Sequence, residues 1–141
     1  MKKIGILIIL SITFIACNTT VNNYTDTEKA CITGIIESDS EAGKIRNYAC
    51  EKQSLSQTIK DYTAHLNAMD FSDCPDGFSM AFKNHIKAWE NIIAITSNHD
   101  KLRGEMHHLF DEISKSTDSA IFNKEVKAIW DTWALVEKEM E

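Results

Sequence analysis

The sequence predicts a small all-α protein, an up-and-down four-helix bundle with a short extra helix at its N-terminal end. After Asn23, apolar residues recur at steps of three and four, which is the spacing of helices that bury one face. The 141 residues contain one proline and five glycines, few helix breakers for this length. Four helices with one apolar stripe each must bury these stripes against one another, and a bundle is the simplest arrangement that does so. Residues 25–141 are therefore expected to form a single helical domain.

Two capping boxes mark the first two expected helices. Thr25 with Glu28 predicts a short helix over about 26–36, because a hydroxyl three residues before a Glu satisfies two unpaired N–H groups at a helix start. In the same way, Ser38 with Glu41 predicts the start of a long second helix that ends near Asn67. The apolar stripe of this second helix consists of Ile45, Tyr48, Leu55, Ile59, Tyr62 and Leu66.

The remaining helices follow from proline, polar breaks and apolar periodicity. Pro75 suits the first turn of a third helix of about 20 residues. A polar run over 96–100 ends it, and a shorter fourth helix is expected over about 102–113, with Gly104 inside it. A second polar break over 114–119 precedes a last helix from about Ala120. Its expected apolar face consists of Phe122, Val126, Ile129, Trp133, Val136 and Met140.

Composition and motifs exclude or disfavour several classes of protein. The formal net charge is −6, without the clustered Lys and Arg that phosphate neutralisation requires, so no nucleic acid is expected as a partner. The sequence has no serine nucleophile elbow, phosphate-binding glycine loop or dinucleotide-binding fingerprint. The protein is therefore expected not to be an enzyme.

The first 17 residues have the layout of a secretory signal. Lys2 and Lys3 precede an uncharged stretch over 4–16, which at 13 residues is shorter than the ~20 residues of a membrane-spanning helix. The end of this stretch, Phe14-Ile15-Ala16-Cys17, resembles the lipobox of bacterial lipoproteins, with Phe14 where Leu is usual. The resemblance covers residues 1–17. It implies cleavage before Cys17, which would then carry a diacylglycerol and usually an N-linked acyl chain.

The mature protein is expected to stand off the membrane on a short tether. Loss of Lys2 and Lys3 changes the net charge from −6 to −8, which disfavours contact with anionic headgroups. The polar stretch over 17–24 fits a lipidated cysteine followed by a tether. By the same resemblance, Asn18 in place of the Asp of inner-membrane retention favours the outer membrane, facing the periplasm.

Three cysteines remain after Cys17, in an oxidising compartment. Cys31 and Cys50 lie almost symmetrically about the expected turn at 38–41, so the spacing predicts a Cys31–Cys50 disulfide. Cys74, just before a helix start, is left over. It is interpreted either as a reactive thiol, favoured there by unpaired N–H groups, or as a buried structural cysteine.

Five histidines raise the alternative of a metal- or haem-binding bundle. The spacing does not match known motifs, since a single Glu-x-x-His is present and both Cys-x-x-Cys-His and His-Glu-x-x-His are lacking. The candidate ligands for a metal ion are His85, Glu105 and His108, and the competing interpretation of His85 is a hydrogen-bonded core histidine.

Trp130 is the candidate partner-binding residue. It falls ~80° from the apolar stripe of the last helix, so it is either an exposed anchor or part of a wide aromatic core. The favoured function is a lipid-anchored, non-catalytic binding module of the cell envelope without a cofactor, whose partner is an envelope protein or a small ligand. By analogy with other small cysteine-bearing lipoproteins, its type would be that of an inhibitor or immunity protein.

Overall fold

The computed structural model describes residues 22–141, and these form an all-α up-and-down bundle, as predicted. The predicted signal peptide, Cys17 and most of the predicted tether lie outside the described residues. The elements in chain order are α1 (Asp26–Ala49), α2 (Leu55–Asn67), α3 (Asp76–Asn91), α4 (Ile93–Thr96), the 3-10 helix η1 (Ser97–His99), α5 (Met106–Ile113) and α6 (Ser119–Met140).

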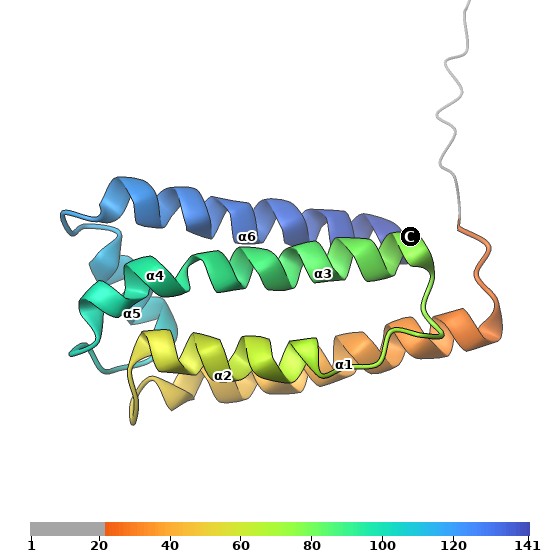
Figure 1. Cartoon of the computed structure of the whole chain (residues 1–141), viewed down its shortest axis with the longest axis horizontal. Coiled ribbons are helices and arrows are strands. Elements are labelled where there is room, and N and C mark those ends of the chain that lie inside the picture. Colours follow the sequence, from red (N-terminus) through yellow and green to blue (C-terminus); the bar gives the residue numbers. More distant parts are fainter. Residues whose placement is uncertain (1–21) are drawn as a thin grey trace, which may run out of the picture.

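The long helices lie in two layers, with α3 beside α6 in one and α1 beside α2 in the other (Figure 1). The most extensive packing joins α3 and α6, and α2 connects the layers by packing on both α1 and α3. The short helices α4 and α5 close one end of the bundle (Figure 1). The four helices of the bundle are therefore α1, α2, α3 and α6.

The core follows from the apolar stripes of α2, α3, α5 and α6. The third helix begins directly after Pro75, and the last begins at Ser119, so both predicted starts are confirmed. Aromatic rings dominate the centre, where Phe82 packs against both Phe71 and Phe78. The largest fully buried apolar side chains are Phe78, Phe82, Phe122, Leu55, Ile59, Leu66, Ile92, Ile113 and Val136.

The predicted turn at 38–41 is wrong, because α1 continues through it to Ala49. Thr25 and Glu28 form the expected capping box at the start of α1, but Ser38 lies in the middle of the helix. The chain turns later, over 50–54, and the next helix begins where the Ser54 hydroxyl accepts a hydrogen bond from the Gln57 N–H. The short extra N-terminal helix is thus part of a long one.

The predicted Cys31–Cys50 disulfide is wrong for the same reason. Cys31 lies near the start of α1 and Cys50 caps its end, and 19 residues of helix span about 28 Å. After the turn at 50–54, α2 runs back along α1 (Figure 1), and the segment that follows α2 contains Cys74. Cys31 and Cys74 form the disulfide, with their Cα atoms 5.2 Å apart.

The interpretation of Cys74 as a reactive thiol is therefore also wrong, since its sulfur is bonded to Cys31. Within residues 22–141 the free thiol belongs to Cys50, which is fully buried next to the end of α1. Burial raises the pKa of the Cys50 thiol, so it stays protonated and unreactive.

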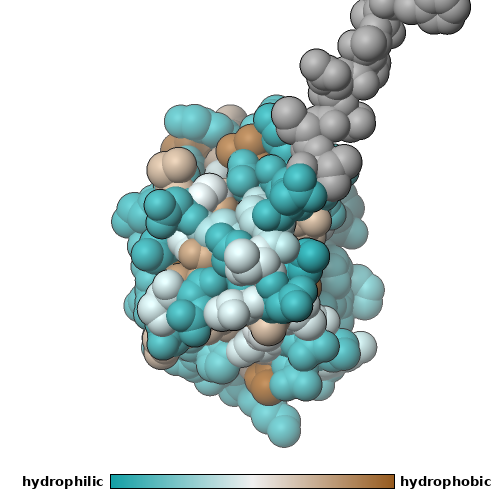
Figure 2. Space-filling model, turned by 90° about the vertical axis from the view of Figure 1, so that its right-hand side faces the viewer, coloured by the Kyte–Doolittle hydropathy of each residue, from teal (hydrophilic) through white to brown (hydrophobic). Residues whose placement is uncertain are grey.

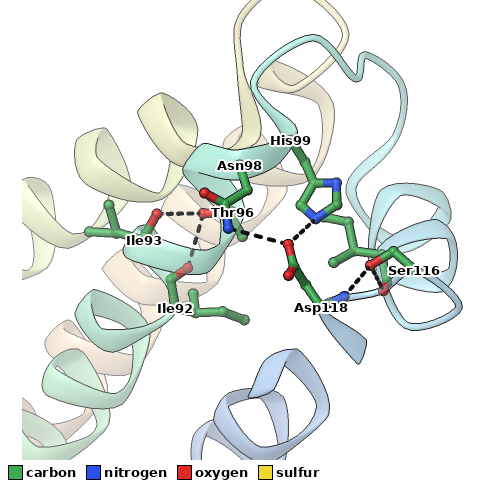
Figure 3. Close-up of polar contacts among 8 residues, drawn as sticks. Ile92, Ile93, Thr96, Asn98, His99, Ser116 and Asp118 are labelled. Carbon is green, nitrogen blue, oxygen red and sulfur yellow. Dashed lines mark hydrogen bonds and ion pairs between the residues drawn. The ribbon is translucent and has the colours of Figure 1, made fainter. Parts of the chain in front are cut away.

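Polar contacts tie together the end of the bundle that α4 and α5 close. The Asp118 carboxylate, just before α6, accepts hydrogen bonds from Asn98 and His99 at 3.2 and 3.1 Å (Figure 3). Gly104, predicted inside the fourth helix, precedes α5 instead. Its φ of 151° is one that favours glycine, and its N–H donates to the Cys50 carbonyl.

The opposite end of the bundle, where α1 begins and α6 ends, is mainly hydrophilic with separate apolar spots (Figure 2). There the Tyr24 hydroxyl donates a hydrogen bond to the Glu139 carbonyl at 2.8 Å, joining the chain before α1 to the end of α6. Among residues 22–141, no helix is long and apolar enough to cross a membrane.

Candidate binding cleft between α1 and α6

A cleft of about 290 Å³ separates the second half of α1 from the middle of α6. It exists because α1 packs on α2 and α5, and α6 packs on α3 and α4, whereas α1 and α6 make little direct contact. The lining residues are Asp39, Ser40, Gly43, Lys44, Arg46, Asn47, Tyr62, His85, Trp89, Ile129, Trp130 and Trp133. We call this site the α1/α6 cleft.

The α1 wall of the cleft is small and polar. Asp39, Ser40, Gly43 and Asn47 recur at steps of three and four, so they share one face of the helix. Gly43 adds no side chain to this wall, and Lys44 is exposed beside it. An inward helix face made of such residues cannot form an apolar contact with α6, and this keeps the cleft open.

Arg46 forms the floor of the cleft and replaces the apolar contact that α1 lacks here. Its guanidinium carbon lies 4.3 Å from the Tyr62 ring centroid and 4.2 Å from that of Trp89. The two rings meet edge to face, so the cation rests in an aromatic corner. Burial lowers the pKa of Arg46, but from so high a starting value that the group stays charged. Its Nε atom is buried without a hydrogen-bond partner in residues 22–141.

Asp39 attaches α1 to the same corner. The Tyr62 hydroxyl donates a hydrogen bond of 2.5 Å to the Asp39 carboxylate. Burial raises the pKa of Asp39 and also that of Tyr62, which therefore remains a protonated donor. One of the two carboxylate oxygens of Asp39 is thus committed to the protein itself.

A chain of hydrogen bonds fixes the back of the cleft. The Trp89 indole N–H can only donate, and it lies 3.1 Å from His85 Nε2, so this nitrogen accepts. His85 therefore carries its proton on Nδ1, which lies 3.1 Å from the Thr132 hydroxyl. That hydroxyl donates in turn to the Ala128 carbonyl. The interpretation of His85 as a hydrogen-bonded core histidine is confirmed.

This arrangement predicts a loss of stability in acid. Burial lowers the pKa of His85 to about 4, below the ~6.5 of an unfolded histidine. Between these values the unfolded chain binds the proton and the folded chain does not, so stability is complete above pH 6.5 and falls as the pH drops toward 4. The expected loss from His85 is about 3 kcal/mol.

Urea unfolding at pH 7 and pH 4 measures this loss. Glutamine can keep both hydrogen bonds but cannot titrate, so His85→Gln should flatten the dependence on pH. An identical dependence in the variant and the parent protein would contradict the role assigned to His85.

The α6 wall is aromatic. Trp130 is 65% exposed at the edge of the cleft, so of its two interpretations the exposed side chain holds and the place in a wide aromatic core is wrong. Trp133, one turn further along α6, packs against His85 with ring centroids 5.2 Å apart and donates its indole N–H to Glu137. With Trp89 on the floor, all three tryptophans of the chain line this one cleft.

A second groove, of about 480 Å³, lies on the other side of α1, facing α2. Its polar side chains are largely bonded to one another: Ser38 to His65 at 3.1 Å, and Gln53 to both Thr58 and Asp61. The Ser38–His65 pair has the groups of a nucleophile and a base. However, Ser38 lies mid-helix, where neighbouring backbone N–H groups are used within the helix and cannot stabilise an oxyanion.

The cleft differs from this groove because several of the donors at its rim are unengaged. Within the described part of the chain, the Ser40 hydroxyl, the Lys44 ammonium and the Trp130 indole N–H have no hydrogen-bond partner or ion pair. The side chains at its rim can therefore bind a ligand without first giving up a protein contact.

The structure does not bring the three predicted metal ligands together. His85 is buried in the hydrogen-bond chain, Glu105 caps α5 and pairs with His107, and His108 is exposed on α5. Among residues 22–141, no three His, Cys, Asp or Glu side chains are grouped so that they could hold a metal ion.

The sequence interpretation missed Asp39, Arg46, Tyr62 and Trp89 as site residues. One signal was available: Asp39, Gly43 and Arg46 continue the helical spacing of Ile32 and Ile35, so polar and small residues occupy the face that these isoleucines begin. Comparison of the chain with protein-family models, with curated proteins and with solved structures finds no match, so the assignment of function depends on this geometry.

Proposed function

We propose that the protein is a lipid-anchored, non-catalytic binding module of the cell envelope, and that its ligand enters the α1/α6 cleft. The observation that carries this proposal is the meeting of all three tryptophans with unengaged hydrogen-bond donors in one open cleft. Pockets that combine aromatic walls with a few polar groups are typical of ligand sites. A packed bundle without such a role would gain stability by closing α1 onto α6.

The proposed anchor is Cys17, on the outer membrane and facing the periplasm. Its support is the sequence alone: two lysines, a 13-residue uncharged stretch and Ala16 before the cysteine. The disulfide between Cys31 and Cys74 is compatible with an oxidising compartment.

Replacing Cys17 with serine should move the protein from the membrane fraction to the soluble fraction, because the thiol is the acceptor of the lipid. Cell fractionation followed by immunoblotting measures this shift. Thr20→Ala, three residues further on, is the matched control and should leave the protein in the membrane. A Cys17→Ser variant that stays in the membrane would contradict the proposed anchor.

Native mass spectrometry of the protein purified from its own membrane tests the binding function. The proposal predicts mass beyond that of residues 17–141 and their lipid, lost on denaturation and absent from a Trp130→Ala variant. Tyr48→Ala is the control, since Tyr48 is 63% exposed on α1 but does not line the cleft. A spectrum with lipid as the sole excess mass would contradict ligand binding, and a bound metal ion or haem would favour the alternative function.

A further inference from the structure

We infer that the α1/α6 cleft binds a small organic anion that consists of a flat aromatic ring and a carboxylate, with the ring on Trp130 and the carboxylate on Lys44. This inference rests on the proposed function and names the class of its ligand. It combines three properties of the cleft: the sign of its charge, the excess of donors and its size.

The charge of the cleft is opposite to that of the protein. Residues 22–141 carry a net charge of −8, because Lys2 and Lys3 lie outside them. The described lining nevertheless contains two cations, Lys44 and Arg46, and one carboxylate, Asp39. Since these two cations outnumber the one carboxylate, the charge of the lining favours an anion.

The hydrogen-bonding groups of the cleft lining also favour an anion. The unengaged donors of the described lining are those of Ser40, Lys44, Asn47 and Trp130, whereas its one unengaged carboxylate oxygen is the second oxygen of Asp39. Donors outnumber acceptors, so a ligand that supplies acceptors, as a carboxylate does, fits this lining. Arg46 is held against two aromatic rings and acts through its charge, so Lys44, exposed on the α1 wall, is the group that meets the carboxylate.

The volume of the cleft and its aromatic α6 wall indicate what the ligand contains besides the carboxylate. A cavity of about 290 Å³ is at the lower end of the range for ligand sites, so it admits one ring with a short acid chain. Trp130 and Trp133 present aromatic surface, on which a flat ring stacks or packs edge to face.

Three probes of one shape but different charge test the inference: phenylacetate, phenylacetamide and 2-phenylethylamine. Titration into the full, oxidised protein, followed by calorimetry and by the indole N–H signals in NMR spectra, gives their affinities. Phenylacetate should bind at least tenfold more tightly than the amide, and the amine should bind most weakly. Equal binding of acid and amide, tighter binding of the amine, or no binding of any probe would overturn the inference.

Single substitutions in the cleft test which side chains contact the carboxylate and the ring of the ligand. Lys44→Met should weaken phenylacetate binding at least tenfold without changing that of the amide, and Lys44→Arg should restore most of it. Lys60→Met is the matched control, because Lys60 is exposed on α2 and does not line the cleft. Trp130→Ala should weaken acid and amide alike. An equal loss of affinity in the Lys44 and Lys60 variants would overturn the assignment of Lys44.

The proposed function and the inference about the class of ligand would be contradicted by different results. If native mass spectrometry finds a bound compound that carries no carboxylate, the inference about the ligand is wrong and the proposed function stands. If no compound is retained and no probe binds, both are wrong.

Discussion

Replacing Cys31 and Cys74 together with serine is expected to lower the free energy of unfolding by about 4 kcal/mol. The disulfide joins residues 43 positions apart, and removing it frees a loop of that length in the unfolded chain. The other contacts of α1 cannot make up for this loss of stability, because the buried residues of this helix are few, Ile32 and Ile35.

Urea unfolding of the double variant against the oxidised parent measures this loss. Reduction of the parent should reproduce most of it, whereas reduction of the variant should change nothing. Hydrogen exchange should then show faster opening of α1 than of α3, because α3 keeps its packing on α6. A loss below ~1 kcal/mol would mean that α1 is held in place mainly by its other contacts.

Replacing Trp89 with alanine is expected to cost 3–5 kcal/mol, in the range that large core aromatics lose. Trp89 is 5% exposed and makes four specific contacts, each with a different residue. It packs edge to face on Tyr62, stacks under Arg46, donates to His85 and lies against Phe110. Its loss leaves a cavity and also deprives His85 Nε2 of its donor.

Trp130→Ala is the matched control, since it removes the same side chain from a site that is 65% exposed. Its cost should stay within about 0.5 kcal/mol, as for most surface substitutions. Thermal or urea unfolding of both variants measures the difference. Similar losses for Trp89 and Trp130 would contradict the assignment of one to the core and the other to the edge of the cleft.

The amphipathic helices were predictable because their pattern is local and repeated. Phe78, Phe82 and Trp89 bury one face of α3, and Phe122, Ile129 and Val136 bury one face of α6, as the periodicity of three and four predicts. The capping box at Thr25 is local as well, and both partners are present in the structure.

The turn after α1 was not predictable from one capping box, because Ser38-x-x-Glu41 and Ser54-x-x-Gln57 match the same pattern. The choice between them depends on tertiary packing. Arg46 and Asp39 attach the second half of α1 to Tyr62 and Trp89, so the helix continues past Ser38. The error in the disulfide followed from the error in the turn.

The site was predictable in part. The angle of Trp130 on α6, which needs only one helix, allowed both an exposed anchor and a place in the core, and the assembled bundle leaves the side chain exposed. The aromatic corner joins Arg46, Tyr62 and Trp89 from three helices, and no pattern in the sequence fixes how these helices are placed relative to one another. The α1/α6 cleft is likewise a property of the assembled bundle.

The most direct test of the account is an NMR comparison of the indole N–H signals in two samples of the ¹⁵N-labelled, oxidised protein. One sample is used as purified from its own membrane, and the other is denatured, freed of small molecules and refolded with its disulfide intact. If a ligand occupies the α1/α6 cleft, the signals of Trp130 and Trp133 differ between the samples, while backbone signals near the Tyr24–Glu139 contact coincide. Coinciding indole signals, with differences elsewhere in the protein, would contradict ligand binding in the α1/α6 cleft.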